Sequence, residues 1–347
     1  FPQMGWFFTK AAFLTFGGSS GVQSFAMAGR TLTVTNPVTI ENPASAAVSN
    51  GTLAGAGVTN LGSLTLVSTT TNSAFTNLGT LLIHGTNTIN GALTTVAGSV
   101  IRVEGANATG TGTLTVLNGF TNTAAIELTN ANVNQAAQLL VTNGTLATTG
   151  TISALVGATG GARTLTAQLD NQSTGTLTVG QALTLNKASA AHTNSGTFTL
   201  SSGNLTLTQS GTTPSFTNTG AITIGSGLFW IINGGTLNQN AGSINGPGTL
   251  DLTSLTANFP AGFSNAALGL NLNNVIVNGP GTLTNAPTQT LTLISSTINA
   301  PLSNQGLLLV HGSNTVNGVL TTVAGAGSVI RVEGINANGT GTLTVLN

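Results

Sequence analysis

The acidic side chains of this sequence are few and lie far apart. They are Glu41, Glu104, Glu127, Asp170, Asp251 and Glu333. A polysaccharide lyase or hydrolase needs clustered carboxylates for acid/base chemistry or for Ca²⁺ binding, whereas no two acids here are close in sequence. We therefore predict that the chain is not an enzyme and uses no metal and no cofactor. A polysaccharide-active β-helix enzyme is kept as a second alternative.

Three polar residues occur in each of two copies. They are His84, Arg102 and Glu104, and later His311, Arg331 and Glu333. In the strand sequence IRVEG the Arg and Glu are two residues apart and point to the same face. One interpretation of this candidate polar cluster is a small binding site that repeats along the chain. The other is a surface Arg–Glu pair, worth ~0–1 kcal/mol, with the histidine packed beside a turn. We expect equivalent places for both histidines, and both Arg–Glu pairs outside the core.

Thr-x-Thr pairs form the second candidate site. The pairs are Thr113 with Thr115, Thr176 with Thr178, Thr206 with Thr208, and Thr342 with Thr344, and further copies lie at 164/166, 197/199 and 282/284. On a strand both hydroxyls face the same way, so stacked strands would form a Thr array that could bind ice or a carbohydrate. The alternative is that Thr is simply a good β-former among small polar residues. The pairs do not follow a strict one-coil spacing, which a single flat array requires.

Two bulky side chains are expected in the core. Trp230 alternates onto one strand face with Leu228 and Ile232, so an aliphatic environment is favoured over an exposed platform for a sugar ring. His192 occupies the apolar position of a turn motif, HTN, whose other copies carry Phe, Val or Leu there. We predict that both residues pack inside.

The polar cluster and one Thr pair belong to a long internal duplication. Residues 82–118 return almost unchanged as residues 309–347. Each copy alternates apolar residues with Thr, Asn or charged residues, and Gly or Asn separates the runs. A period of two is typical of strands with one buried face, and Gly and Asn tolerate tight turns. The duplication therefore predicts a repetitive all-β chain.

Composition excludes several other classes of protein. Only 3% of the 347 residues are charged, the net charge is zero, and there are 47 glycines and no cysteine. The regular Leu, Ile and Val content disfavours disorder, and glycine lacks the three-residue period of collagen. After residue 30 no apolar run is long enough for a membrane span. Because long-range electrostatic attraction is missing, nucleic acid is not expected as a partner.

A recurring turn motif sets the expected architecture. An apolar residue, then Thr, Ser or Asp, then Asn, precedes strands at sites such as FTNLGTLLI and FTNTGAITI. The clearest neighbours are roughly 17 to 24 residues apart, which fits one coil of a solenoid. We predict a single elongated, right-handed parallel β-solenoid with coils of about 20–24 residues, an apolar interior and stacked Asn ladders. Separate β-sandwich domains are the disfavoured alternative, because their repeat is about 100 residues.

The N-terminal segment, residues 1–30, differs from the rest. It is rich in aromatics, and a Lys, a short apolar run and Ala26-Met27-Ala28 suggest a signal peptide, although a capping segment is the alternative. Residues 6–18 also resemble a short segment of the chromate transporter family. We assign residues 1–30 to this signal-like or capping segment and residues 31–347 to the solenoid. Because the chain ends inside a repeat, we expect that the natural protein continues past Asn347 and that this chain self-associates through its last coil.

From residue 31 onward the sequence resembles repetitive passenger and stalk regions of bacterial surface proteins, of the filamentous-haemagglutinin-like and autotransporter adhesin type. The FTNTGAITI and GPGTLT units carry this resemblance. It implies a secreted or cell-surface structural protein that acts as a stalk or display scaffold. Partners would be host or matrix glycans or other copies of the chain. The first alternative function is an ice- or carbohydrate-binding solenoid that uses the Thr pairs.

Overall fold

The computed structural model describes residues 15–16, 22–26, 29–132, 134–323, 327–334 and 339–346. Within these residues there is no helix, and therefore no helix that could span a membrane. The strands form a parallel β-solenoid of about 14 turns. The predicted fold class is confirmed. Most of the N-terminal signal-like or capping segment lies outside the described residues.

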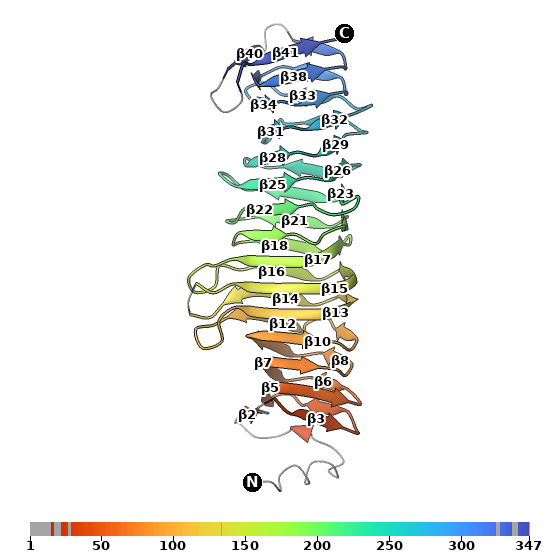
Figure 1. The fold of residues 1–347 in the computed structure, drawn as a ribbon, viewed down its shortest axis with the longest axis vertical. Coiled ribbons are helices and arrows are strands. Elements are labelled where there is room, and N and C mark those ends of the chain that lie inside the picture. Colours follow the sequence, from red (N-terminus) through yellow and green to blue (C-terminus); the bar gives the residue numbers. More distant parts are fainter. Residues whose placement is uncertain are drawn as a thin grey trace. The chain divides into compact units, whose positions relative to one another are not determined.

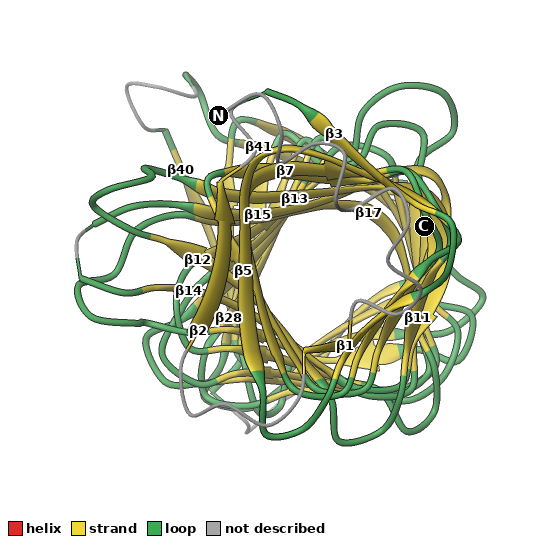
Figure 2. Ribbon diagram, turned by 90° about the horizontal axis from the view of Figure 1, so that it is seen from below, coloured by secondary structure: helices red, strands yellow, loops and turns green. Residues whose placement is uncertain are grey.

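The chain divides into two compact units. The first comprises residues 1–170 and 174–183, and the second comprises residues 171–173 and 184–347. Within each unit, strands from successive coils stack on one another (Figure 1). Viewed end-on, the strands form the walls and the turns and loops lie outside them (Figure 2).

The strands that begin before residue 183 are β1 (Thr15–Phe16), β2 (Val22–Ala26), β3 (Thr31–Val34), β4 (Val38–Ile40), β5 (Ser45–Gly55), β6 (Val58–Asn60), β7 (Ser63–Thr71), β8 (Phe75–Asn77), β9 (Thr80–His84), β10 (Thr86–Ile89), β11 (Leu93–Thr95), β12 (Val100–Gly105), β13 (Gly112–Asn122), β14 (Ala125–Asn130), β15 (Ala137–Thr148), β16 (Thr151–Ala154), β17 (Arg163–Asn171) and β18 (Thr176–Val179).

The later strands are β19 (Leu183–Leu185), β20 (Ala191–Asn194), β21 (Thr197–Leu200), β22 (Leu205–Thr208), β23 (Ser215–Asn218), β24 (Ala221–Ile224), β25 (Phe229–Asn233), β26 (Thr236–Gln239), β27 (Ser243–Asn245), β28 (Thr249–Thr253), β29 (Thr256–Asn258), β30 (Phe263–Ser264), β31 (Gly269–Asn273), β32 (Ile276–Asn278), β33 (Leu283–Asn285), β34 (Thr290–Ile294), β35 (Thr297–Ile298), β36 (Leu302–Asn304), β37 (Leu307–His311), β38 (Ser313–Val316), β39 (Leu320–Thr322), β40 (Val329–Glu333) and β41 (Thr342–Val345).

Apolar residues stack in columns along the interior of each unit. In the first unit one column contains Leu81, Ile101, Ile126, Ile152 and Leu177, which are direct partners in β9, β12, β14, β16 and β18. In the second unit a column contains Trp230, Leu250, Leu270, Leu291 and Leu308. All of these side chains are buried. Burial of one such side chain contributes about 1.5–3 kcal/mol, so these columns hold successive coils together.

Buried asparagines form the expected ladders. In the second unit the amide of Asn194 donates to Asn218 at 2.8 Å, and Asn218 donates to Gln239 at 2.9 Å. A second ladder joins Asn265 to Asn285 at 2.9 Å and Asn285 to Asn304 at 2.7 Å. A buried amide without a partner costs about 1–3 kcal/mol, and stacking supplies that partner from the next coil. Where the turn motif ends a strand with Asn, the in-register residue of the next coil therefore supplies a partner for its side chain.

Coil lengths vary more widely than the sequence predicts. The direct partners Asn60 and Asn77 are 17 positions apart, whereas Ser313 and Thr342 are 29 positions apart. In the first copy of the duplication the corresponding long coil, from Thr86 to Thr113, includes the segment between β12 and β13. The loops that the structure describes lie outside the walls (Figure 2), so the segment between β12 and β13 can change in length without disturbing the stacked columns.

His192 lies inside the second unit as the sequence predicts. It is 1% exposed and is the direct partner of Phe216, whose ring centroid is 5.3 Å from that of Trp230 and 5.8 Å from that of Phe198. Burial lowers the pKa of His192 from 6.5 to about 4, because desolvation disfavours the imidazolium. The folded chain therefore holds a neutral histidine among aromatic rings.

This burial predicts acid sensitivity of the second unit. Between about pH 6.5 and pH 4 the unfolded chain binds a proton at His192 that the folded chain does not bind, so stability is present above this range and falls as pH drops through it. The expected loss is about 2–3 kcal/mol, measured by denaturant unfolding at pH 7 and pH 4.5. His192→Phe should remove this part of the pH dependence, and His84→Gln should retain it. Equal pH dependence in wild type and His192→Phe would contradict the assignment.

Candidate functional site

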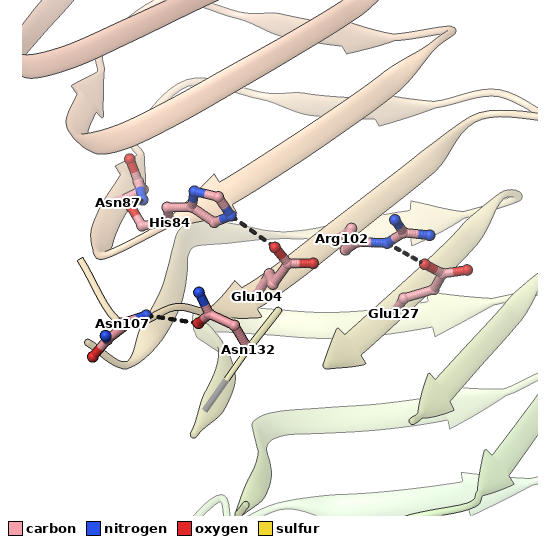
Figure 3. Close-up of polar contacts among 7 residues, drawn as sticks. All are labelled: His84, Asn87, Arg102, Glu104, Asn107, Glu127 and Asn132. Atoms are coloured by element: carbon pink, nitrogen blue, oxygen red, sulfur yellow. Dashed lines mark hydrogen bonds and ion pairs between the residues drawn. The ribbon is translucent and has the colours of Figure 1, made fainter. Parts of the chain in front are cut away.

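The candidate polar cluster of the first unit lies on three neighbouring strands. His84 ends β9, Arg102 and Glu104 point outward from β12, and Glu127 points outward from β14 (Figure 3). His84 Nε2 is 3.0 Å from Glu104 Oε1, and Arg102 Nε donates to Glu127 Oε2 at 2.7 Å. All four side chains are partly exposed. The cluster contains two separate polar contacts, the His84–Glu104 contact and the Arg102–Glu127 ion pair, and each joins one coil to the next.

The stacking geometry explains why Arg102 contacts Glu127 instead of Glu104. Arg102 and Glu127 are direct partners in parallel strands, about 4.8 Å apart, whereas residues two apart in one strand are about 6.6 Å apart. The same register brings Glu104 beside His84, because Val103 is the partner of Ile83. The Arg–Glu pair expected within β12 is therefore not formed in the first copy. Glu127, which the sequence interpretation left outside the cluster, takes part in it.

A buried asparagine fixes the corner that carries His84. Asn87 donates from Nδ2 to the carbonyl of His84 at 2.8 Å and accepts at Oδ1 from the Thr69 backbone N–H at 2.8 Å. Gly85 takes a φ of 64° between them, a conformation that side-chain-bearing residues rarely adopt. The second copy has the same corner, in which Asn314 donates to the carbonyl of His311 at 2.8 Å. The repeated His-Gly-x-Asn order is the signal that could have identified these asparagines.

The two copies occupy equivalent register positions but make different contacts. His311 is the partner of Glu333, the same relation that places His84 beside Glu104, yet His311 Nδ1 lies 3.3 Å from the backbone carbonyl oxygen of Glu333. Arg331 Nε lies 3.6 Å from Glu333 Oε1 in its own strand. Among the described strands β40 pairs only with β37, so Arg331 has no counterpart of Glu127 there. The contacts of the duplicated residues thus depend on the neighbouring coil.

The Arg102–Glu127 pair and the Arg331–Glu333 pair lie outside the core, and their side chains are solvent-accessible. Each charge in the first cluster has an opposite or polar partner at close range. Among the residues that the structure describes, no group of three or more His, Asp or Glu side chains could hold a metal ion. The arrangement can therefore strengthen contacts between coils.

The Thr-x-Thr pairs of the first unit do not build the array that the sequence suggested. Thr115 is half-buried and stacks between Thr88 on one side and Leu140 on the other, so an aliphatic side chain ends the hydroxyl row there. Thr113, its companion, likewise lies between Thr86 and Gln138. Thr178 is also half-buried and stacks on Ser153, and Thr176 stacks on Thr151. Thr115 and Thr178 therefore belong to separate short runs of hydroxyls. The prediction that these pairs form one continuous Thr array is wrong for the first unit.

The two pairs of the second unit are also separate from each other. Thr206 and Thr208 stack on Ile231 and Asn233, which carry no hydroxyl. Thr342 and Thr344 stack on Ser313 and Thr315. The reason is that the two pairs lie in different runs of stacked strands. The strand of Thr206, β22, stacks on β25, β28 and β31, whereas the strand of Thr344, β41, stacks on β38, β35 and β32. A regular outward surface does exist in the second unit, but it is built from a Thr-x-Asn motif.

The regular outward surface of the second unit consists of two neighbouring columns, one mostly of Thr and one of Asn. In the second unit an outward column contains Thr236, Thr256, Ile276, Thr297, Thr315 and Thr344. Beside it runs a column of Asn238, Asn258, Asn278, Asn299 and Asn317. We call these two columns the Thr/Asn face. Sequence reasoning missed it because it searched for Thr-x-Thr, although the recurrent TLN, TAN, TIN and TVN were available as a signal.

Trp230 is fully buried, and the prediction of a core position is confirmed. Its Nε1 has no hydrogen-bond partner among the described residues. Phe229, its neighbour in β25, is the exposed aromatic of this strand. Trp230 is therefore not available as a platform for a sugar ring.

Arg163 is a structural residue that the sequence did not reveal. It is 1% exposed and donates from its guanidinium to five backbone carbonyls, those of Gln135, Leu155, Val156, Gly160 and Ala162, at 2.9–3.2 Å. Burial lowers its pKa, because desolvation disfavours the charge. The five carbonyls belong to the segments before β15 and between β16 and β17. Arg163 thus holds two loops of the first unit against the solenoid.

Comparisons of the sequence with protein-family models and with curated proteins, and of the structure with solved structures, found no match.

Arg102 and Arg163 make a matched pair for mutation. Arg163→Met should destabilise the first unit by about 3–5 kcal/mol, because five carbonyls lose a charged donor inside the protein. Arg102→Met should cost at most about 1 kcal/mol, because Arg102 is 44% exposed and its pair with Glu127 is screened by solvent. Urea unfolding followed by circular dichroism measures both. Similar losses in the two variants would show that the contacts of Arg163 are not formed.

Proposed function

We propose that this chain is an extracellular structural protein, a stalk or display scaffold of the adhesin type at a cell surface. The observation that carries the proposal is the coil-to-coil register within each unit. Every strand pair described is parallel and joins residues one coil apart, and the interior columns and amide ladders repeat with it. A fold of this kind lengthens by adding coils without any change in the coils already present, which suits a spacer.

The outer surface supports the same proposal. Thr, Asn and Ser occupy outward positions on the strands, where charged residues are usual, and only 3% of the chain is charged. Such a surface is hydrated through hydroxyls and amides, and it exerts little electrostatic attraction on passing macromolecules. The likeness of the repeat units to passenger and stalk regions of surface proteins supports an extracellular location.

Labelling of intact cells tests the location. An antibody raised against the purified chain should bind source cells that have not been permeabilised, and brief protease treatment of those cells should remove the signal. A cytoplasmic marker protein that survives the same treatment is the control. Labelling that requires permeabilisation would refute an extracellular scaffold.

A further inference from the structure

The Thr/Asn face is a regular, uncharged surface on the outside of the second unit. Its Thr column runs through direct partners in β26, β29, β32, β35, β38 and β41, with Ile276 as the one member that is not Thr. With about 4.8 Å between coils, this column spans about 24 Å, and the Asn column lies about 6.6 Å away along the strands. No member of either column carries a charge.

The asparagines of this face are held in one orientation by their own hydrogen bonds. Asn258 donates to Asn238 at 2.7 Å, Asn278 to Asn258 at 3.0 Å, Asn299 to Asn278 at 2.8 Å, and Asn317 to Asn299 at 2.7 Å. Unlike the buried ladders, this one is partly exposed to solvent. A side-chain amide has two N–H donors and an oxygen with two acceptor positions. Asn258, Asn278 and Asn299 therefore each retain one donor and one acceptor for a ligand, and the side chains are already ordered before it binds.

These properties select a ligand class. The lack of charge gives no attraction for nucleic acid or for an acidic polymer. A row of alternating donors and acceptors beside a row of hydroxyls matches a polymer rich in hydroxyl groups. The spacing of the rungs is similar to the length of one sugar residue, so neighbouring sugars of an extended chain can meet neighbouring rungs. Ile276, which is 47% exposed, offers an apolar contact for the C–H face of a pyranose ring.

We propose that the Thr/Asn face binds a neutral polysaccharide chain that lies along the two columns. Hydroxyls of the sugar donate to the free amide oxygens and accept from the free amide N–H groups, while Thr methyl groups and Ile276 contact the ring carbons. Ice is the competing ligand for a regular Thr surface. Ile276 disfavours ice, because it interrupts the hydroxyl row near its centre and projects a larger apolar group than Thr.

Retention on insoluble neutral polysaccharides tests the proposal. The probes are cellulose, chitin and a β-1,3-glucan, and the full chain should be retained on at least one of them. The double variant Thr236→Lys/Thr256→Lys places two bulky charges on the face and should weaken binding about tenfold, or about 1.4 kcal/mol. The matched control is Asn271→Lys/Thr292→Lys, two adjacent outward positions of the same unit on β31 and β34, and it should bind within about twofold of wild type.

A second measurement, NMR of side-chain amides, uses the wild-type chain and so does not require that a variant folds correctly. On addition of a soluble neutral glucan, the side-chain amide resonances of Asn258, Asn278 and Asn299 should shift, and those of the buried Asn285 should not. Three results would overturn the proposal: no retention on any of the three polysaccharides, equal loss of binding in both Lys pairs, or ice-growth inhibition that the first Lys pair abolishes in a chain that binds no polysaccharide.

Discussion

Parallel, in-register stacking of one coil on the next is the constraint on which every other feature depends. A strand in either unit cannot satisfy its backbone, bury its apolar face or pair its terminal amide without the neighbouring coil. The interior column from Trp230 to Leu308 and the ladder from Asn265 to Asn304 follow the same register, although one is held by apolar contact and the other by hydrogen bonds. A slip by one residue would turn both columns to the wrong side, because side chains alternate along a strand. Apolar burial and amide pairing therefore specify one and the same alignment.

The same constraint determines what the surface can do. Stacking brings together side chains that are one coil apart in the sequence. Functional groups on this fold therefore form columns along the surface, whereas the functional groups of a cleft converge on one point. Arg102 meets Glu127 across 25 positions of sequence, and Asn278 meets Asn258 across 20. Duplication of a segment copies side chains, but not the neighbours on which they stack. This accounts for the different partners of Arg102 and Arg331, because Glu127 lies outside the duplicated segment, and it makes the regular Thr/Asn face a more informative feature than the duplicated charges.

Much of the fold could be predicted from the sequence, because its signals are local. Period-two alternation indicated the strands, and the Asn turns indicated both the solenoid and its ladders. Side-chain partners could not be predicted, because the number of residues between stacked strands varies from 17 to 29 positions, so the partner of an outward residue does not lie at a fixed distance in the sequence. Thr115, which stacks against Leu140 instead of another Thr, is an example. Arg163 was missed for another reason: its partners are backbone carbonyls of two loops, and no side-chain motif records them.

Disulfide trapping of register partners tests the stacking most directly, since the chain has no cysteine of its own. Asn271 and Thr292 are direct partners on the outside of β31 and β34. Cysteines at these positions should form a disulfide on mild oxidation, because Cα atoms about 4.8 Å apart lie within the range that the bond requires. Cysteines at Asn271 and Ile294, two residues out of register and about 8 Å apart, should not. Efficient bonding of 271 to 294, or failure of 271 to bond to 292 in a folded chain, would contradict the parallel register of these coils.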